Sequence, residues 1–204
     1  MALKDPNLDD MDAVNEALFK FVWNFKHGDN IIYNFTVLQA LYAAQANTRQ
    51  GSIFNKPITI LLVSIIEGVL IDFLTRIDQA TTHLPANVSR ETLDKIKLEI
   101  ESKKRPEKIS DILGEHIVVR RKMYQFGEII KILQKYELFG NKDDQIYKDL
   151  VQFGHLRNRV HIENYYRNFE DRETFVFTDV RRCELEGVLT LLWTKMTNDY
   201  IRPW

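Results

Sequence analysis

The chain has 204 residues, of which 45% are hydrophobic and 28% charged, the composition of a soluble globular protein with one core. Its formal net charge of −1 excludes a globally basic nucleic-acid binder, and its single cysteine excludes an internal disulfide or a thiolate metal cluster. Only 8 Gly and 5 Pro separate long periodic segments, which favours a mostly helical fold.

The N-terminal quarter predicts two helices. The acidic start lacks the basic region and apolar core of a signal peptide. Apolar side chains at helical spacing predict a first helix over 11–26, which Gly28 is expected to stop in a left-handed conformation. A second helix is expected over about 33–47, before a turn at Gly51.

Residues 57–76 are apolar on nearly every side, which predicts a helix surrounded by other helices. Its apolar run, 58–71, is too short and too interrupted to span a bilayer, so we expect a cytoplasmic protein without membrane contact. Glu67 lies in the middle of this helix. It either faces solvent on a polar stripe with Asp72, or it is paired, neutral or turned to a cleft, because burying a lone charge costs several kcal/mol.

The middle of the chain is less regular. Ser89 is a good N-cap for a surface helix over 90–103, whose apolar positions are Leu93, Ile96 and Ile100. A short helical turn is expected near 110–113, and the apolar triplet 117–119 is either a loop or the start of the next helix. That helix should extend over 119–139 and end near Gly140.

Two more helices complete the chain. The first covers 145–166, and Thr178 caps the second, over 179–200. Between them, 174–177 alternates like a strand but has no obvious partner, and we interpret it as an extended, partly buried connection. The prediction is a single all-α domain, 1–204. Residues 57–204 form an antiparallel bundle of four main helices (57–76, 119–139, 145–166, 179–200), and residues 1–56 form an N-terminal helical extension.

Arg157 and His161 are the residues with the clearest chemical potential. They are four positions apart, so they are neighbours on an unbroken helix, on a face that is otherwise apolar. Imidazole transfers protons near neutral pH, and a guanidinium holds a phosphate through two parallel hydrogen bonds. The plain alternative is a solvated pair or one satisfied by a carboxylate. A metal site is not expected, because His155 and His161 are six apart and no His-Glu-x-x-His pattern occurs. Cys183 is expected to be a small core residue.

The sequence Arg157-Asn158 followed by His161, late in a helix of an all-helical domain, resembles the motif of the HEPN superfamily. The resemblance is strongest over 153–164 and weaker around Glu67. In the family an Arg with a polar next residue, often Asn, usually precedes the His with four to six intervening residues. Three residues intervene here, which changes the angle between the two side chains by roughly 100° for each residue of difference.

The resemblance implies a metal-independent endoribonuclease that acts as a homodimer and needs no cofactor. Arg157, Asn158 and His161 would be the catalytic residues, and Glu67 would orient Arg157 or His161. The family also implies a toxin or antiphage-defence role with a cognate antitoxin or defence partner.

Two residues near the motif, Arg159 and Tyr165, are candidate RNA contacts. Arg159 can instead pair with Glu163, four residues later, and Tyr165 can instead close the helix against the core. The alternative functions are a non-catalytic scaffold, RNA-binding or toxin-neutralising module, which the short spacing and the near-zero net charge favour, and a nucleotide-binding cleft.

Overall fold

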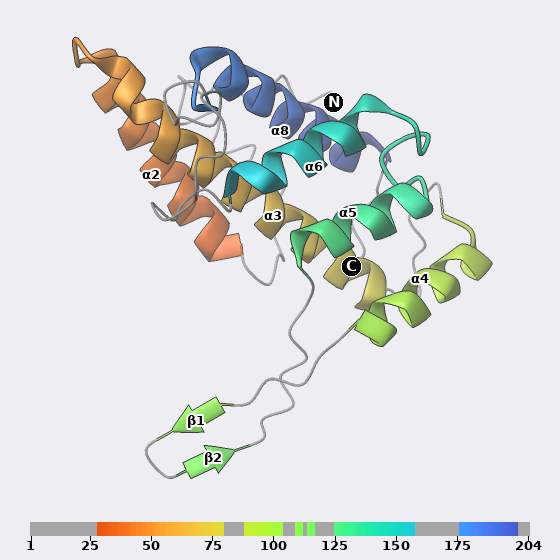
Figure 1. Ribbon diagram of the computed structural model, residues 1–204. Coiled ribbons are helices and arrows are strands. Elements are labelled where there is room, and N and C mark those ends of the chain that lie inside the picture. Colours follow the sequence, from red (N-terminus) through yellow and green to blue (C-terminus); the bar gives the residue numbers. More distant parts are fainter. Residues whose placement is uncertain are drawn as a thin grey trace, which may run out of the picture.

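A computed structural model of the 204-residue chain describes residues 28–79, 88–103, 109–111, 114–116, 125–157 and 176–199. The described elements are α2 (Gly28–Ala46), the short 3-10 helix η1 (Gly51–Phe54), α3 (Asn55–Gln79), α4 (Arg90–Lys103), strands β1 (Ile109–Asp111) and β2 (Gly114–His116), α5 (Phe126–Lys135), α6 (Gln145–Arg157) and α8 (Asp179–Asp199) (Figure 1). The prediction of a helical fold is confirmed, with one small hairpin added to it.

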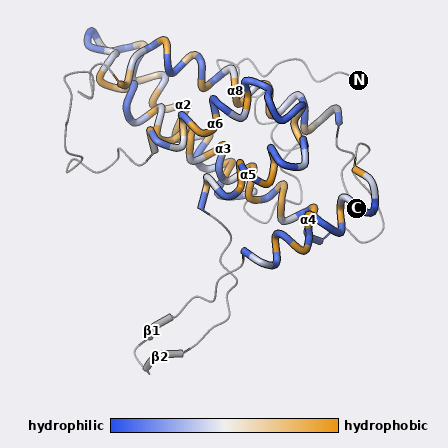
Figure 2. The backbone as a smooth tube through the Cα atoms, turned by 45° about the vertical axis from the view of Figure 1, so that its right-hand side comes forward, coloured by the Kyte–Doolittle hydropathy of each residue, from blue (hydrophilic) through white to orange (hydrophobic). Residues whose placement is uncertain are grey.

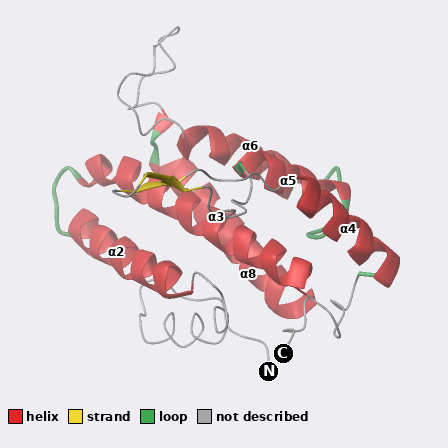
Figure 3. Cartoon of the chain, turned by 90° about the horizontal axis from the view of Figure 1, so that it is seen from below, coloured by secondary structure: helices red, strands yellow, loops and turns green. Residues whose placement is uncertain are grey.

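Helix α3 is the centre of the molecule. It packs against α2, α4, α5, α6 and α8, and Figure 3 shows it between α2 on one side and α5 with α6 on the other. Its buried residues lie on nearly every side, as its continuous apolar sequence predicts. By length and composition the described segment Gly51–Gln79 could cross a membrane, and 67% of its most apolar window is buried inside the protein. Core helices of soluble proteins pass the same test.

Two helices begin where their capping residues predict. The Ser89 hydroxyl accepts the backbone N–H of Thr92 at 3.2 Å, and α4 begins at the next residue, Arg90. The Thr178 hydroxyl accepts the backbone N–H of Arg181 at 3.3 Å at the start of α8. Helix α4 buries Leu93, Ile96 and Ile100 as expected. Figure 2 shows hydrophobic and hydrophilic colours alternating along α4.

Three local expectations are wrong. Gly28 does not stop a helix in a left-handed conformation, because it is the first residue of α2 and its φ is not positive. Ser110 and Asp111, which belong to the turn of helix expected at 110–113, lie instead in strand β1, which pairs Ile109 with His116 and Asp111 with Gly114 in an antiparallel hairpin. Val176 is buried as expected, but it is helical rather than extended. The helix expected over 11–26 lies outside the described residues.

The helix predicted over 119–139 is shorter than expected. Gln125 has an extended backbone (φ −66°, ψ 143°), so α5 begins at Phe126, and it ends at Lys135. A turn over 136–140 follows, in which the backbone N–H of Leu138 donates to the carbonyl of Leu133 at 2.9 Å. Gly140 has φ +125°, where a side chain would be strained and where an added Cβ would overlap the carboxylate of Asp144.

The α5–α6 turn is fixed by one buried tyrosine. The Tyr147 hydroxyl accepts the backbone N–H of Phe139 at 3.1 Å and lies 3.2 and 3.1 Å from the carbonyl oxygens of Leu133 and Gly140. Burial raises the pKa of Tyr147, so the hydroxyl keeps the proton that it shares with these carbonyls. These three contacts of the phenol therefore fix the position of the first turn of α6 against the α5–α6 turn.

Candidate functional site

Helix α6 carries the start of the predicted catalytic motif. Its inward face buries Ile146, Leu150, Phe153 and Leu156 in the common core, which is the periodicity that the sequence predicts. Arg157 is the last described residue of α6. Four other predicted site residues lie outside the described residues: Asn158, Arg159, His161 and Tyr165. Whether these side chains lie close to Arg157 therefore stays a prediction.

The turn of α6 that precedes Arg157 packs unusually close to α5. A Cβ added at Gly154 would lie 2.7 Å from Cδ1 and 3.1 Å from Cε1 of the Phe126 ring, closer than real Cβ atoms approach other atoms. Gly154 therefore lets the first residue of α5 contact the backbone of α6. Arg157 follows three residues later, which is about one helical turn, or roughly 4.5 Å along the axis.

Glu67 is a buried carboxylate in the middle of α3. Only 9% of it is exposed, and Asp72 is 1% exposed. The expectation of a solvent-facing polar stripe formed by these two residues is therefore wrong. A buried carboxylate is stable only where it is protonated or paired. Helices α3 and α6 pack together, but the pairing of Glu67 with Arg157 or His161 stays a prediction, because those two side chains lie outside the described part of the chain.

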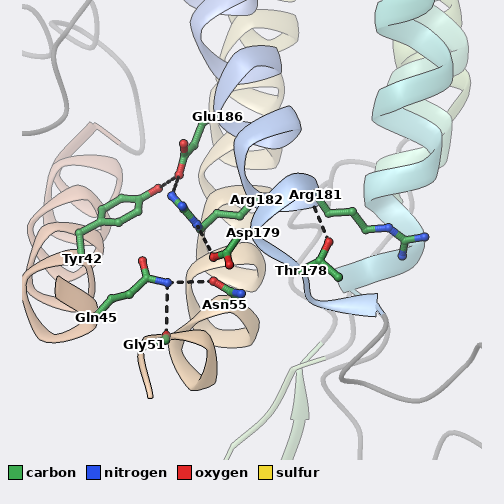
Figure 4. A network of polar contacts seen from close by, with 9 residues as sticks. All are labelled: Tyr42, Gln45, Gly51, Asn55, Thr178, Asp179, Arg181, Arg182 and Glu186. Atoms are coloured by element: carbon green, nitrogen blue, oxygen red, sulfur yellow. Dashed lines mark hydrogen bonds and ion pairs between the residues drawn. The ribbon is translucent and has the colours of Figure 1, made fainter. Parts of the chain in front are cut away.

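A polar cluster that the sequence analysis missed joins α2 to α8 (Figure 4). The Tyr42 hydroxyl of α2 donates to the carboxylate of Glu186 on α8, and that carboxylate also accepts the guanidinium of Arg182. The guanidinium carbon lies 5.6 Å from the centre of the Tyr42 ring, and Nε of Arg182 lies 3.9 Å from Oδ1 of Asp179. We call these four residues the α2–α8 cluster.

The α2–α8 cluster is suited to structure rather than to proton transfer. Burial and then the hydrogen bond to Glu186 raise the pKa of Tyr42 well above its ordinary value, so the phenol stays neutral. One oxygen of Glu186 accepts both Tyr42 and Arg182. The spacing of Arg182 and Glu186 predicts a helical ion pair. Tyr42 is 144 residues away in sequence, so no local pattern could have indicated it.

A second set of polar contacts fastens the start of α3 to α2. The Gln45 side-chain amide donates to Oδ1 of Asn55 at 2.9 Å and to the carbonyl of Gly51 at 3.3 Å. An added Cβ on Gly51 would lie 3.0 Å from the carbonyl oxygen of Gln45, so a side chain there would push the turn away from α2. These contacts explain the turn that the sequence predicts at Gly51.

Two further predictions concern sulfur and metal chemistry. Cys183 is exposed on α8, so the expectation of a core cysteine is wrong. It lies two residues before Leu185, about 200° around the helix from the buried stripe. Within the described ranges, no group of three His, Cys, Asp or Glu side chains is placed to hold a metal ion.

Comparisons with known proteins returned no matching family model, no matching curated protein and no matching solved structure.

Proposed function

We propose that the protein is a metal-independent endoribonuclease of HEPN type that acts as a homodimer in the cytoplasm. The observation that carries this proposal is the sequence Arg157-Asn158 followed by His161, which begins at the last described residue of α6. We also propose that α3, α5, α6 and α8 form an antiparallel four-helix bundle, the arrangement that the sequence pattern predicts. Two copies of the motif would meet across a two-fold axis to form one site.

The proposed reaction uses the 2′-hydroxyl of the RNA as its nucleophile. This oxygen bonds to the adjacent phosphorus while the bond from phosphorus to the 5′-oxygen of the next nucleotide breaks. His161 removes the proton of the 2′-hydroxyl or supplies a proton to the leaving 5′-oxygen. Arg157 binds the phosphate and stabilises the charge that develops on its oxygens, and Asn158 positions the phosphate or the imidazole. The products are a 2′,3′-cyclic phosphate and a free 5′-hydroxyl.

The buried carboxylate of Glu67 supports this proposal without deciding it. A carboxylate that is 9% exposed on a helix packed against α6 is suited to orient a cation, and both Arg157 and protonated His161 are cations. Arg159 and Tyr165 would contact the RNA. A toxin or antiphage-defence role, restrained by an antitoxin or another defence partner, is the biological setting that we propose.

The decisive test is RNA cleavage in excess chelator by the wild type and by the Arg157→Ala and His161→Ala variants. His155→Ala is a matched control, because His155 is an exposed histidine on the same helix. We expect wild type and control to release 2′,3′-cyclic phosphate ends, and His161→Ala to be slower by about two to four powers of ten. Equal cleavage by all four proteins would assign the activity to another site or to a contaminant.

A non-catalytic module is the second candidate function. The three-residue spacing between Arg157 and His161 favours it, because the family usually has a longer interval. Binding of RNA by a folded dimer that cleaves none of several RNAs would establish this module in place of the nuclease. A chain that stays monomeric at micromolar concentration would count against the shared site.

A further inference from the structure

Helix α2 has an outward face that lacks charge. Of its 19 residues only Asp29 is charged, whereas α4 has eight charged residues among 14. The outward face of a surface helix normally carries charged side chains. The exposed residues along the middle of α2 follow one another at steps of three and four positions: Tyr33, Thr36, Ala40 and Ala43. We call these four residues the α2 seam.

The opposite face of α2 is already covered by the core. Its buried residues are Ile31, Phe35 and Leu38, and Cγ1 of Ile31 lies 3.6 Å from the position that a Cβ on Gly68 of α3 would take. Among the described elements α2 packs mainly against α3 and η1, and it lies at the edge of the described helices (Figure 3). Leu38 and Ala40 are about 200° apart around the helix, so the α2 seam faces away from this core.

The polar side chains on and beside the α2 seam are bonded to the helix itself. The Thr36 hydroxyl donates to the carbonyl oxygen of Ile32 at 3.2 Å, and the Asn34 side-chain amide donates to the carbonyl oxygen of Asn30 at 2.8 Å. These bonds satisfy polar groups that water would otherwise satisfy. The seam is therefore an uncharged surface of mostly small residues, and such a surface gains free energy when another apolar surface covers it.

The charges at the two ends of the α2 seam are self-complementary. Asp29 lies 11 residues before Ala40, and Arg49, in the turn that follows α2, lies nine residues after it. Both residues are exposed. A second α2 that lies antiparallel and is centred near Ala40 would therefore place Asp29 of each copy beside Arg49 of the other. The difference of two residues is about 3 Å along a helix axis, which an arginine side chain spans.

We propose that α2 pairs antiparallel with α2 of a second copy of this chain, on a two-fold axis near Ala40. Such an interface uses the same surface on both copies, so that surface must complement itself. The small side chains at Ala40 and Ala43 let two helix axes approach to about 8 Å. Tyr33, which is 68% exposed in one chain, lies over the small end of the other seam. Opposite charges at nearly equal distances from Ala40 favour a second copy over a different protein.

This interface goes beyond the dimer of the proposed function. Helix α6 lies on the other side of α3 from α2 (Figure 3). Pairing through α2 therefore leaves α6 free for the two-fold contact that a shared catalytic site requires. A chain that has two different two-fold interfaces assembles beyond the dimer. With both contacts the protein is a tetramer or a larger assembly, and with the α2 contact alone it is a dimer.

Sedimentation velocity of the full-length protein at micromolar concentrations tests the proposal. Ala40→Glu places two carboxylates against each other near the axis, and Ala43→Glu is a second, independent variant. Each substitution is at an exposed position and introduces a good helix former, so each chain should fold. Leu98→Glu is the matched control, because it adds the same charge at a side chain that is 73% exposed on α4. We expect both seam variants to raise the dissociation constant of the α2 contact at least about a hundredfold and to halve the mass of the assembly, and the control to behave like wild type.

A charge reversal tests the antiparallel arrangement. Asp29→Arg and Arg49→Asp, each alone, bring like charges together at both ends of the interface and should weaken the contact roughly tenfold. The double variant restores the opposite charges and should recover most of the affinity, a non-additive result that shows direct pairing. Single variants that associate like wild type, or a double variant that recovers nothing, would overturn the antiparallel pairing.

The masses of wild type and seam variants separate this interface from the proposed nuclease. A monomeric wild type, or seam variants with the mass of wild type, would overturn the α2 interface. Seam variants that unfold at a lower temperature but keep the wild-type mass would also overturn it, and would assign the seam to a contact within one chain. Seam variants that keep both the wild-type dimer and its RNA cleavage would overturn the interface and leave the nuclease intact. A wild-type dimer that Ala40→Glu separates into monomers would support the interface and refute the dimer at the motif.

Discussion

Gly154→Ala tests whether α5 and α6 are as close as the structure places them. The new Cβ would lie 2.7 Å from Cδ1 of Phe126, so either the ring or the helix must shift. Inserting a methyl group into a packed site costs about 1–3 kcal/mol. Alanine is also a better helix former than glycine by about 1 kcal/mol. The net effect on the free energy of unfolding is therefore a loss of up to about 2 kcal/mol.

A matched glycine on α8 separates these two contributions. A Cβ added at Gly187 has no neighbouring atom within 4 Å, so Gly187→Ala gains the helix propensity without the clash. The Gly154 variant should therefore be less stable than the Gly187 variant by about 1–3 kcal/mol. At this chain length each kcal/mol corresponds to about 2–4 °C in Tm. Urea and thermal unfolding, followed by circular dichroism, measure the difference.

The partner of the clash provides a second check. Phe126→Leu removes ring atoms that the Gly154 Cβ would meet, so the double variant should recover part of the loss, a non-additive result that shows direct contact. Equal stabilisation by Gly154→Ala and Gly187→Ala would refute the close packing of α5 on α6.

Two further predictions concern single hydrogen bonds. Tyr42→Phe removes the donor to Glu186 and should lower the free energy of unfolding by about 1–2 kcal/mol, whereas Tyr33→Phe, at a residue 68% exposed, should change it little. Burial and the bond to Glu186 raise the pKa of Tyr42 above its ordinary value of 10.0, so the unfolded chain loses this proton at lower pH than the folded protein does. The difference in free energy of unfolding between wild type and Tyr42→Phe should therefore shrink as pH rises above 10. A difference that stays constant with pH would contradict the buried bond. Ser89→Ala removes the hydroxyl that accepts the N–H of Thr92 and should lower the free energy of unfolding by about 1 kcal/mol, as measured by thermal unfolding. Ser89→Asp should largely restore this stability. An alanine variant as stable as wild type would show that the cap is not formed in solution.

The sequence by itself determined the features that depend on neighbouring residues. Ser89 and Thr178 cap α4 and α8 because a hydroxyl reaches the backbone N–H three residues later. The continuous apolar run of α3 indicated a surrounded helix. The helical period of α8 also predicts that Cys183 is exposed, because Cys183 lies about 200° around the helix from the buried Leu185.

The tertiary structure alone decided the features that depend on residues far apart in the chain. The burial of Glu67 and Asp72 follows from helices packed around α3. The bond between Tyr42 and Glu186 joins two residues that are 144 positions apart in the chain. The close approach of Gly154 to Phe126 depends on the turn that Tyr147 holds. Local periodicity states which face of a helix is apolar, but it contains no information on which neighbour covers that face. The motif at Arg157 is a local pattern, and its chemistry depends on the neighbours that the fold supplies.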